Sequence, residues 1–188
     1  DSILAMQSWS TAQRVAGRTI AVVPTMGALH EGHLSLIDRA RREADLAVVT
    51  IFVNPTQFGP NEDYSSYPRT FARDRQLCEL RGTAALFAPH AAEMYPDDAS
   101  TWVEETALSR GLCGRSRPGH FRGVTTVVAK LFLVTLPDVA IFGEKDYQQA
   151  MIIRRMARDL DFPVRIVTAP LIRDVDGLAL SSRNTRLT

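Results

Sequence analysis

Two histidines three residues apart, His30 and His33, are the side chains whose types and spacing point most directly to chemistry. Gly27 and Gly32 lie beside them and permit a tight turn with close approach of the backbone to a ligand. Where a helix begins after such a turn, its unpaired N–H groups and dipole favour an anion, and imidazoles can donate hydrogen bonds to phosphate oxygens. The pattern therefore indicates a phosphate site, although two surface histidines beside an ordinary turn explain the spacing equally well. A zinc site is disfavoured because neither cysteine is nearby.

The segments around these histidines alternate between short apolar runs and helical patterns. The apolar runs predict strands over residues 19–23, 46–53, 84–88, 138–142 and 164–168. The helical patterns lie over residues 2–16, 32–44, 70–81, 123–136 and 146–161. This alternation is typical of βαβ units, so we expect an α/β fold in which a doubly wound, Rossmann-like parallel sheet is flanked by helices. Ligands of such sheets bind at the carboxyl ends of the strands, and the histidines follow one of those ends.

Composition and charge exclude several other classes of protein. The 188 residues suit one domain, and 45% hydrophobic with 23% charged residues is ordinary for a soluble globular chain. The 22 basic and 21 acidic residues leave a net charge of +1, so no nucleic-acid partner is expected. No apolar stretch fits a membrane span. Cys78 and Cys113 lack metal or CxxC spacing, which indicates a reduced, cytoplasmic protein.

Six segments carry a resemblance to a known family. The string from His30 to His33 resembles the HxGH signature of the nucleotidyltransferase superfamily, and the longer string PTMGALHEGH (24–33) resembles the pantoate–β-alanine ligase family. Further matches to that family follow in order: FVNPTQFG (52–59), YPRT (67–70), RPGHFRGV (117–124), FGEKDYQQ (142–149) and SSRN (181–184). The resemblance spans the chain from about Ile20 to Asn184.

This resemblance implies an enzyme that uses ATP to couple pantoate to β-alanine. The family forms a pantoyl-adenylate with release of pyrophosphate, and the amine then displaces AMP to give pantothenate. A carboxylate is already ionised at neutral pH, so the first step needs positioning and positive charge rather than a general base. We therefore expect the turn around the two histidines to act as a cationic cradle in which two anions can meet.

The resemblance also implies roles for individual side chains. The residues expected to act in catalysis are His30, His33, Lys145 and Arg183, and those expected to contact ATP are Met26, Gly27, His30, His33, Gly143, Lys145, Asp146, Ser181, Ser182 and Arg183. The residues expected to bind pantoate are Pro24, Met26, Gln57 and Gln149, while Arg117 and His120 could reach the phosphates or the acyl intermediate from a loop. Read without the resemblance, Lys145 is a solvated lysine and the SSRN segment is a polar turn.

Magnesium is expected with ATP, bound mostly through phosphate oxygens and water. Asp74 occupies the position of a family carboxylate, which makes it the candidate metal ligand. Its neighbour Arg73 stands where some relatives carry an acidic residue. An aspartate on a helix surface is the simpler explanation of Asp74.

Family members carry a further carboxyl-terminal region that closes over the ATP site. We therefore expect residues 1–188 to form a single nucleotide-binding domain without this lid, one that turns over slowly because water reaches the adenylate. The resemblance also implies a homodimer. Two alternatives stay open: another HxGH adenylyltransferase that makes a dinucleotide cofactor, and a non-catalytic nucleotide-binding or dimerisation module.

Overall fold

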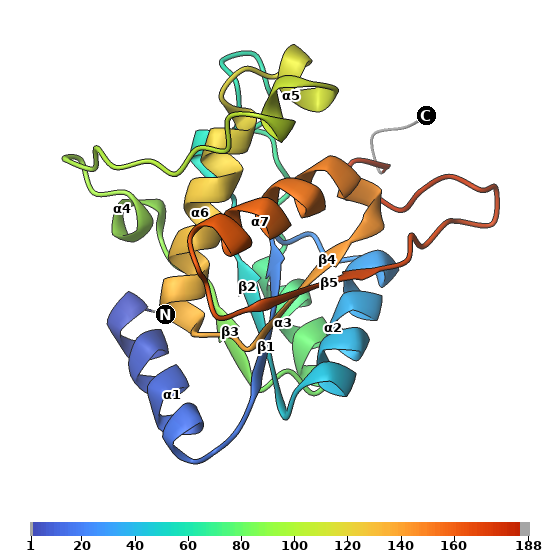
Figure 1. Ribbon diagram of the computed structural model, residues 1–188. Coiled ribbons are helices and arrows are strands. Elements are labelled where there is room, and N and C mark those ends of the chain that lie inside the picture. The colour runs from blue at the N-terminus through green and yellow to red at the C-terminus, as the bar shows by residue number, and fades with distance from the viewer. Residues whose placement is uncertain (1, 185–188) are drawn as a thin grey trace.

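Five parallel strands form the centre of the molecule in the computed structural model, which describes residues 2–184 (Figure 1). The strands are β1 (Ile20–Thr25), β2 (Leu46–Ile51), β3 (Ala85–Phe87), β4 (Val139–Gly143) and β5 (Arg165–Ala169), in the spatial order β3-β2-β1-β4-β5. In the central strand, Val22 pairs with Val48 of β2 on one side and Ala140 of β4 on the other. This is the predicted Rossmann-like sheet, and the fold-class prediction is confirmed.

Helices cover both faces of the sheet (Figure 1). The longer helices are α1 (Ile3–Val15), α2 (Glu31–Glu43), α3 (Phe71–Leu80), α6 (His120–Thr135) and α7 (Tyr147–Asp159). Because side chains alternate along a strand, Ile20 and Val22 of β1 pack with α1, α6 and α7, whereas Ala21 and Val23 pack with α2 and α3. All four side chains are fully buried, as expected for a parallel strand covered on both faces.

Every predicted strand and helix is present, with small shifts at the ends. The largest shift at a helix start is in α6, which begins at His120 rather than at residue 123, so His120 belongs to the helix and not to the preceding loop. Short helices that the periodicity did not reveal are η1 (Pro55–Gln57), α4 (Ala91–Met94), η2 (Leu108–Arg110), α5 (Cys113–Ser116) and η3 (Glu144–Asp146). Each is a single turn, too short to produce a repeating pattern of apolar residues.

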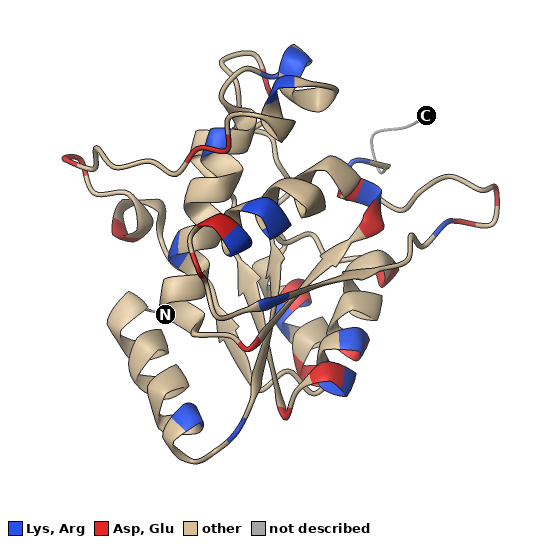
Figure 2. Ribbon diagram, viewed as in Figure 1, with Lys and Arg blue, Asp and Glu red and all other residues tan. Residues whose placement is uncertain are grey.

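The strand order creates a crevice at one edge of the sheet. After β1 the chain turns to α2 and β2 on one side, whereas β4 and β5 extend the sheet on the other side. Loops leaving β1 and β4 therefore diverge, and the space between them is the usual ligand site of doubly wound sheets. Basic and acidic residues both occur along α2 and α7 (Figure 2). Within residues 2–184, no helix has the length and apolar character that crossing a membrane requires.

Candidate active site

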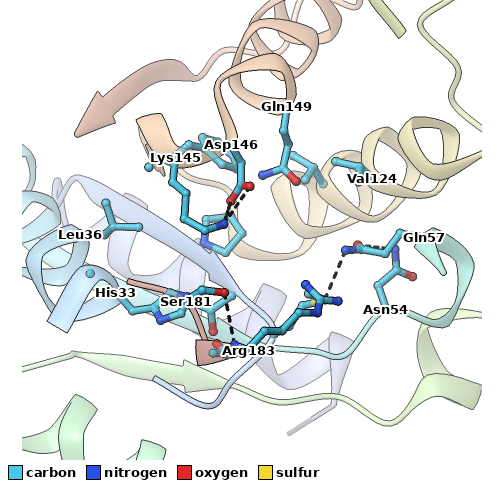
Figure 3. A pocket seen from close by; sticks show the side chains of 18 of the residues that line it. His33, Leu36, Asn54, Gln57, Val124, Lys145, Asp146, Gln149, Ser181 and Arg183 are labelled. Atoms are coloured by element: carbon cyan, nitrogen blue, oxygen red, sulfur yellow. Dashed lines mark hydrogen bonds and ion pairs between the residues drawn. The ribbon is translucent and has the colours of Figure 1, made fainter. Parts of the chain in front are cut away.

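A cavity of about 240 Å³ opens at the carboxyl ends of the central strands (Figure 3). Of the residues singled out in the sequence, those that line it are Pro24, Met26, His30, His33, Gln57, Arg117, His120, Gly143, Lys145, Asp146, Gln149, Ser181, Ser182 and Arg183. They come from five segments that are far apart in the chain. The tertiary structure therefore brings together the proposed ATP and pantoate groups, while Gly27 and Asp74 lie outside the cavity lining.

The turn between β1 and α2 aims the start of α2 at this cavity. Two consecutive residues of the turn, Gly27 and Ala28, have positive φ angles of 83° and 50°. Gly27 suits this conformation, and Ala28 adopts it at the cost of backbone strain. Gly32 in the first turn of α2 is needed for space, because a Cβ atom there would lie 2.9 Å from the ring of His30.

His30 and His33 accept backbone hydrogen bonds at the same ring nitrogen. The Nδ1 atom of His30 accepts from the N–H of Gly32 at 3.2 Å, and the Nδ1 atom of His33 accepts from the N–H of His30 at 3.3 Å. Since Nδ1 is the acceptor in both rings, the proton of each neutral imidazole lies on Nε2. The two rings, 4.0 Å apart between centroids, can thus donate Nε2–H to an anion in the cavity.

The surroundings of both imidazoles favour the neutral form of the ring. Burial lowers the pKa of His33 to about 3, and the neighbouring His30 and Lys145 act in the same direction. Burial, followed by the charge of Lys145, also lowers the pKa of His30. The turn is therefore not the cationic cradle expected from the sequence. Its histidines are neutral donors, and the positive charge of the site comes from other segments.

Lys145 supplies one of these charges from the 3-10 turn η3, directly after β4. Its Nζ atom donates to Asp146 Oδ1 at 3.1 Å and to Oδ2 at 3.2 Å. Figure 3 shows both side chains directed into the cavity opposite Ser181. The ammonium group is a mobile point charge, since a lysine on a surface turn can rotate between a carboxylate and another anion.

Arg183 supplies a second charge from the SSRN segment. Its Nε and Nη2 atoms donate to the two carboxylate oxygens of Asp63 at 2.9 and 2.8 Å. The guanidinium also lies 5.5 Å from the centre of the Tyr67 ring. Two serines fix this segment: Ser181 Oγ accepts from the N–H of Arg183 at 3.2 Å, and Ser182 Oγ donates to the carbonyl of Ala28 at 3.1 Å.

Arg117 supplies a third charge, before the start of α6. It forms a two-pronged ion pair with Glu62, with both N–O distances at 2.6 Å. The pairing lowers the pKa of Glu62. His120 donates from Nδ1 to the carbonyl of Gln57 at 2.8 Å, because a carbonyl can only accept, and its Nε2 accepts from Arg117 Nη1 at 3.0 Å. Burial lowers the pKa of His120. Because its Nδ1 donates whereas Nδ1 of His30 accepts, the neutral His120 ring is the tautomer opposite to that of His30.

Amides and apolar side chains also line the cavity. Gln57 and Gln149 face the cavity from η1 and from the first turn of α7 (Figure 3). The apolar lining includes Leu36, Phe52, Phe58, Val124, Val127, Val128, Leu131 and Phe142. Neutral amides beside branched apolar walls suit a small acid with hydroxyl and methyl groups.

Asn54 is a cavity residue that the sequence analysis did not single out. Its side chain is 1% exposed, and Nδ2 donates to Gln57 Oε1 and to the carbonyl of Gly123, both at 3.1 Å. Gln57 is thereby held with its NH₂ group 3.3 Å from Met26 Sδ. A Cβ atom at Gly123 would lie 2.4 Å from the carbonyl oxygen of Thr56, so glycine allows η1 to approach α6. The FVNPTQFG string contained a signal that could have identified Asn54, because this residue follows a predicted strand and directly precedes Pro55.

The residues around Asp74 do not fit a magnesium ion. The Asp74 side chain is fully buried, and its two oxygens accept hydrogen bonds from Ala28, Leu29 and Thr70. Mg²⁺ requires an open octahedral arrangement and keeps several waters. Among residues 2–184, no three His, Cys, Asp or Glu side chains are grouped so that they could hold a metal. Asp74 therefore does not fit the metal-ligand role expected of it from the sequence, and no step of the chemistry below is assigned to a metal.

Comparisons with known proteins agree on one family. Residues 1–188 match the family model described as pantoate-beta-alanine ligase. A protein named pantothenate synthetase from Moorella thermoacetica is 57% identical over 187 residues, which are 100% of this chain and 66% of that protein.

Solved structures of similar sequence also superimpose closely. A pantothenate synthetase from Thermus thermophilus has a TM-score of 0.94 at 49% identity and is covered over 67% of its length. A pantoate-β-alanine ligase from Francisella tularensis, complexed with β-γ ATP and β-alanine, has a TM-score of 0.95 at 43% identity and is covered over 72% of its length. This chain thus spans about two thirds of the length of these relatives.

Proposed function

Because the chain belongs to the pantoate–β-alanine ligase family, we propose that it performs the ATP-dependent condensation of pantoate with β-alanine. The observation that carries this proposal is the division of one cavity into two halves. The imidazoles of His30 and His33 with Lys145 and Arg183 offer donors to a triphosphate, and Gln57 with its apolar neighbours faces them. The relative from Francisella tularensis, complexed with β-γ ATP and β-alanine, supports both molecules as ligands.

In the first step, a carboxylate oxygen of pantoate attacks the α-phosphorus of ATP, and the bond to the bridging oxygen of pyrophosphate breaks. Both reactants are anionic, so the main barrier is repulsion and alignment. The Nε2–H groups of His30 and His33 and the amides at the start of α2 donate to the α-phosphoryl oxygens. Lys145 and Arg183 offset the charge on the departing pyrophosphate. No group on the protein has to remove a proton.

In the second step, the neutral amine of β-alanine attacks the carbonyl carbon of the pantoyl-adenylate. The C–N bond forms, the carbonyl–oxygen bond to AMP breaks, and one proton passes to the solvent. Gln57 and Gln149 hold the hydroxyl and carboxyl groups of the pantoyl part during both steps. Pro24 and Met26 also line the cavity. Arg117 and His120 line it beside Gln57, whose carbonyl accepts hydrogen bonds from both.

Several parts of the family pattern stay predictions. These are the homodimer, the cytoplasmic location, Mg²⁺ carried in with ATP, and the organisation of residues 1–188 as a single nucleotide-binding domain.

Exchange of labelled pyrophosphate into ATP tests the proposal. We expect the exchange to occur with pantoate present and to stop when pantoate is omitted, because only the first step running backward incorporates the label. Exchange that requires a mononucleotide instead of pantoate would favour another adenylyltransferase. Calorimetric binding of ATP without any exchange would favour a non-catalytic nucleotide-binding module.

A further inference from the structure

We propose that Arg73 and Asp74 are positioning residues that clamp the β1–α2 turn and thereby set the place of His30, and that Asp74 acts through the backbone rather than through a metal. This inference rests on the proposed function, because it concerns the same phosphate site. It deepens that function by giving the two residues a task that neither the motif nor the family match assigns.

The clamp is formed by contacts of Asp74 with two successive backbone amides. Asp74 Oδ2 accepts from the N–H of Ala28 at 2.8 Å, and Oδ1 accepts from the N–H of Leu29 at 2.9 Å. The hydroxyl of Thr70 donates to both oxygens at 3.1 Å and fixes the rotamer of the carboxyl group. With its side chain 0% exposed, Asp74 has no open side from which to receive a hydrated cation.

Arg73 completes the clamp from the same helix turn. Its Nη1 atom donates to the carbonyl of Leu29 at 3.2 Å. Both backbone groups of Leu29 are therefore held by α3, the N–H by Asp74 and the carbonyl by Arg73. A guanidinium beside the carboxyl group also repels a divalent cation, so this pair of residues is suited to holding the backbone and unsuited to holding Mg²⁺.

The turn needs such a clamp because its backbone is strained. Gly27 and Ala28 both have positive φ angles, and a non-glycine residue persists there only when its surroundings enforce it. The clamp lies directly behind the site: Leu29 is followed by His30, the residue that caps α2 and presents Nε2–H to the cavity. Small displacements of such donors are costly, since a shift of about 1 Å can reduce the rate of a reaction about 100-fold.

The experiment compares Asp74→Asn, Arg73→Gln and a stability control, Met94→Ala, with the unsubstituted chain. Asn offers one acceptor in place of two, and Arg73→Gln is a milder change at an exposed residue that keeps the fold if Asp74→Asn does not. Met94 is fully buried in the core cluster on the other face of the sheet, so its truncation lowers stability without touching the turn. Calorimetry measures ATP affinity over a series of Mg²⁺ concentrations, and ¹⁵N spectra of the imidazoles report the tautomers of His30 and His33.

We expect Asp74→Asn to weaken ATP binding at least tenfold and Arg73→Gln about threefold, with altered His30 resonances in both. For both variants, the Mg²⁺ concentration that gives half of the maximal increase in ATP affinity stays within twofold of that for the unsubstituted chain. Met94→Ala leaves the ATP affinity and the imidazole spectrum unchanged. The proposal is overturned if Asp74→Asn raises the Mg²⁺ requirement tenfold while the His30 signals stay as they were. It is also overturned if both clamp variants bind ATP normally, or if Met94→Ala causes the same loss. Failure of the proposed function gives a different result, namely no pantoate-dependent exchange by the unsubstituted chain.

Discussion

Arg183 and Asp63, which are 120 residues apart in the chain, face each other as a two-pronged ion pair at the cavity, with N–O distances of 2.9 and 2.8 Å. The same arrangement recurs between Arg117 and Glu62, and Lys145 is paired with its neighbour Asp146. Glu62 and Asp63 are adjacent, so one short loop neutralises two arginines at the site. Phosphate groups that approach Arg183 must therefore compete with a carboxylate that already occupies its donors.

The first prediction concerns this competition. Replacing Asp63 by Asn leaves the loop in place and removes the competing charge. We expect ATP to bind about two- to fivefold more tightly, because partly exposed ion pairs of this kind are worth about 0.2–1 kcal/mol. Calorimetric titration of ATP measures the change. Asp98→Asn, which alters the net charge equally at an exposed residue, is the control and should leave the affinity unchanged. Equal or weaker binding by Asp63→Asn would mean that Arg183 does not exchange partners.

The second prediction concerns Lys145. Lys145→Gln keeps most of the length of the side chain and removes its positive charge. We expect the rate of pantoate-dependent pyrophosphate exchange to fall about 100-fold or more, because one electrostatic donor to the transition state is lost. The side chain is 38% exposed, so the thermal unfolding midpoint should hardly change. The other lysine of the chain, Lys130, is in α6, and its Nζ atom lies 5.7 Å from the centre of the Tyr95 ring. Lys130→Gln is thus a matched control, and a similar loss there would contradict a specific role for Lys145.

The third prediction concerns the width of the pantoate half of the cavity. Gly123→Ala places a methyl group 2.4 Å from the carbonyl oxygen of Thr56, so η1 must move and carry Gln57 with it. We expect the KM for pantoate to rise about tenfold while the affinity for ATP changes less than twofold. Kinetics of pyrophosphate exchange with each substrate varied in turn provide the measurement. At Gly111 a Cβ atom would meet open space, so Gly111→Ala should have no effect. Equal losses for pantoate and ATP would indicate general distortion instead.

The fourth prediction concerns pH. Burial lowers the pKa of His33 to about 3 from 6.5, so the unfolded chain binds a proton on this residue before the folded chain does. The stability that this group contributes is complete above about pH 6.5 and is lost progressively as the pH falls toward 3. Urea unfolding between pH 7.5 and 4.5 should show a steep decline for the unsubstituted protein and a shallower decline for His33→Asn. His90→Asn, at an exposed position, should keep the steep decline. Identical slopes for His33→Asn and the unsubstituted chain would contradict the assigned burial effect.

The order of strands and helices was predictable from the sequence because it is encoded locally. Alternating apolar runs and helical periods reveal each element without reference to the others. Gly17 and Gly82, both with positive φ, directly follow the C-caps of α1 and α3 and are local signals of the same kind. The family and its phosphate motif were predictable for the same reason, since HEGH is a contiguous string at a strand end. The family prediction is confirmed by the match over residues 1–188.

Only the tertiary structure determined the partners and the protonation states of the site residues. No local pattern pairs Arg183 with Asp63 or turns Asp74 toward Ala28, because these contacts depend on how separate loops meet at one edge of the sheet. Nor does the sequence reveal that His33 is neutral, because desolvation depends on what surrounds the ring in space. The motifs of the sequence indicated which residues are candidates for a phosphate site, and packing determined which of them line the cavity, which are paired there and which hold the backbone.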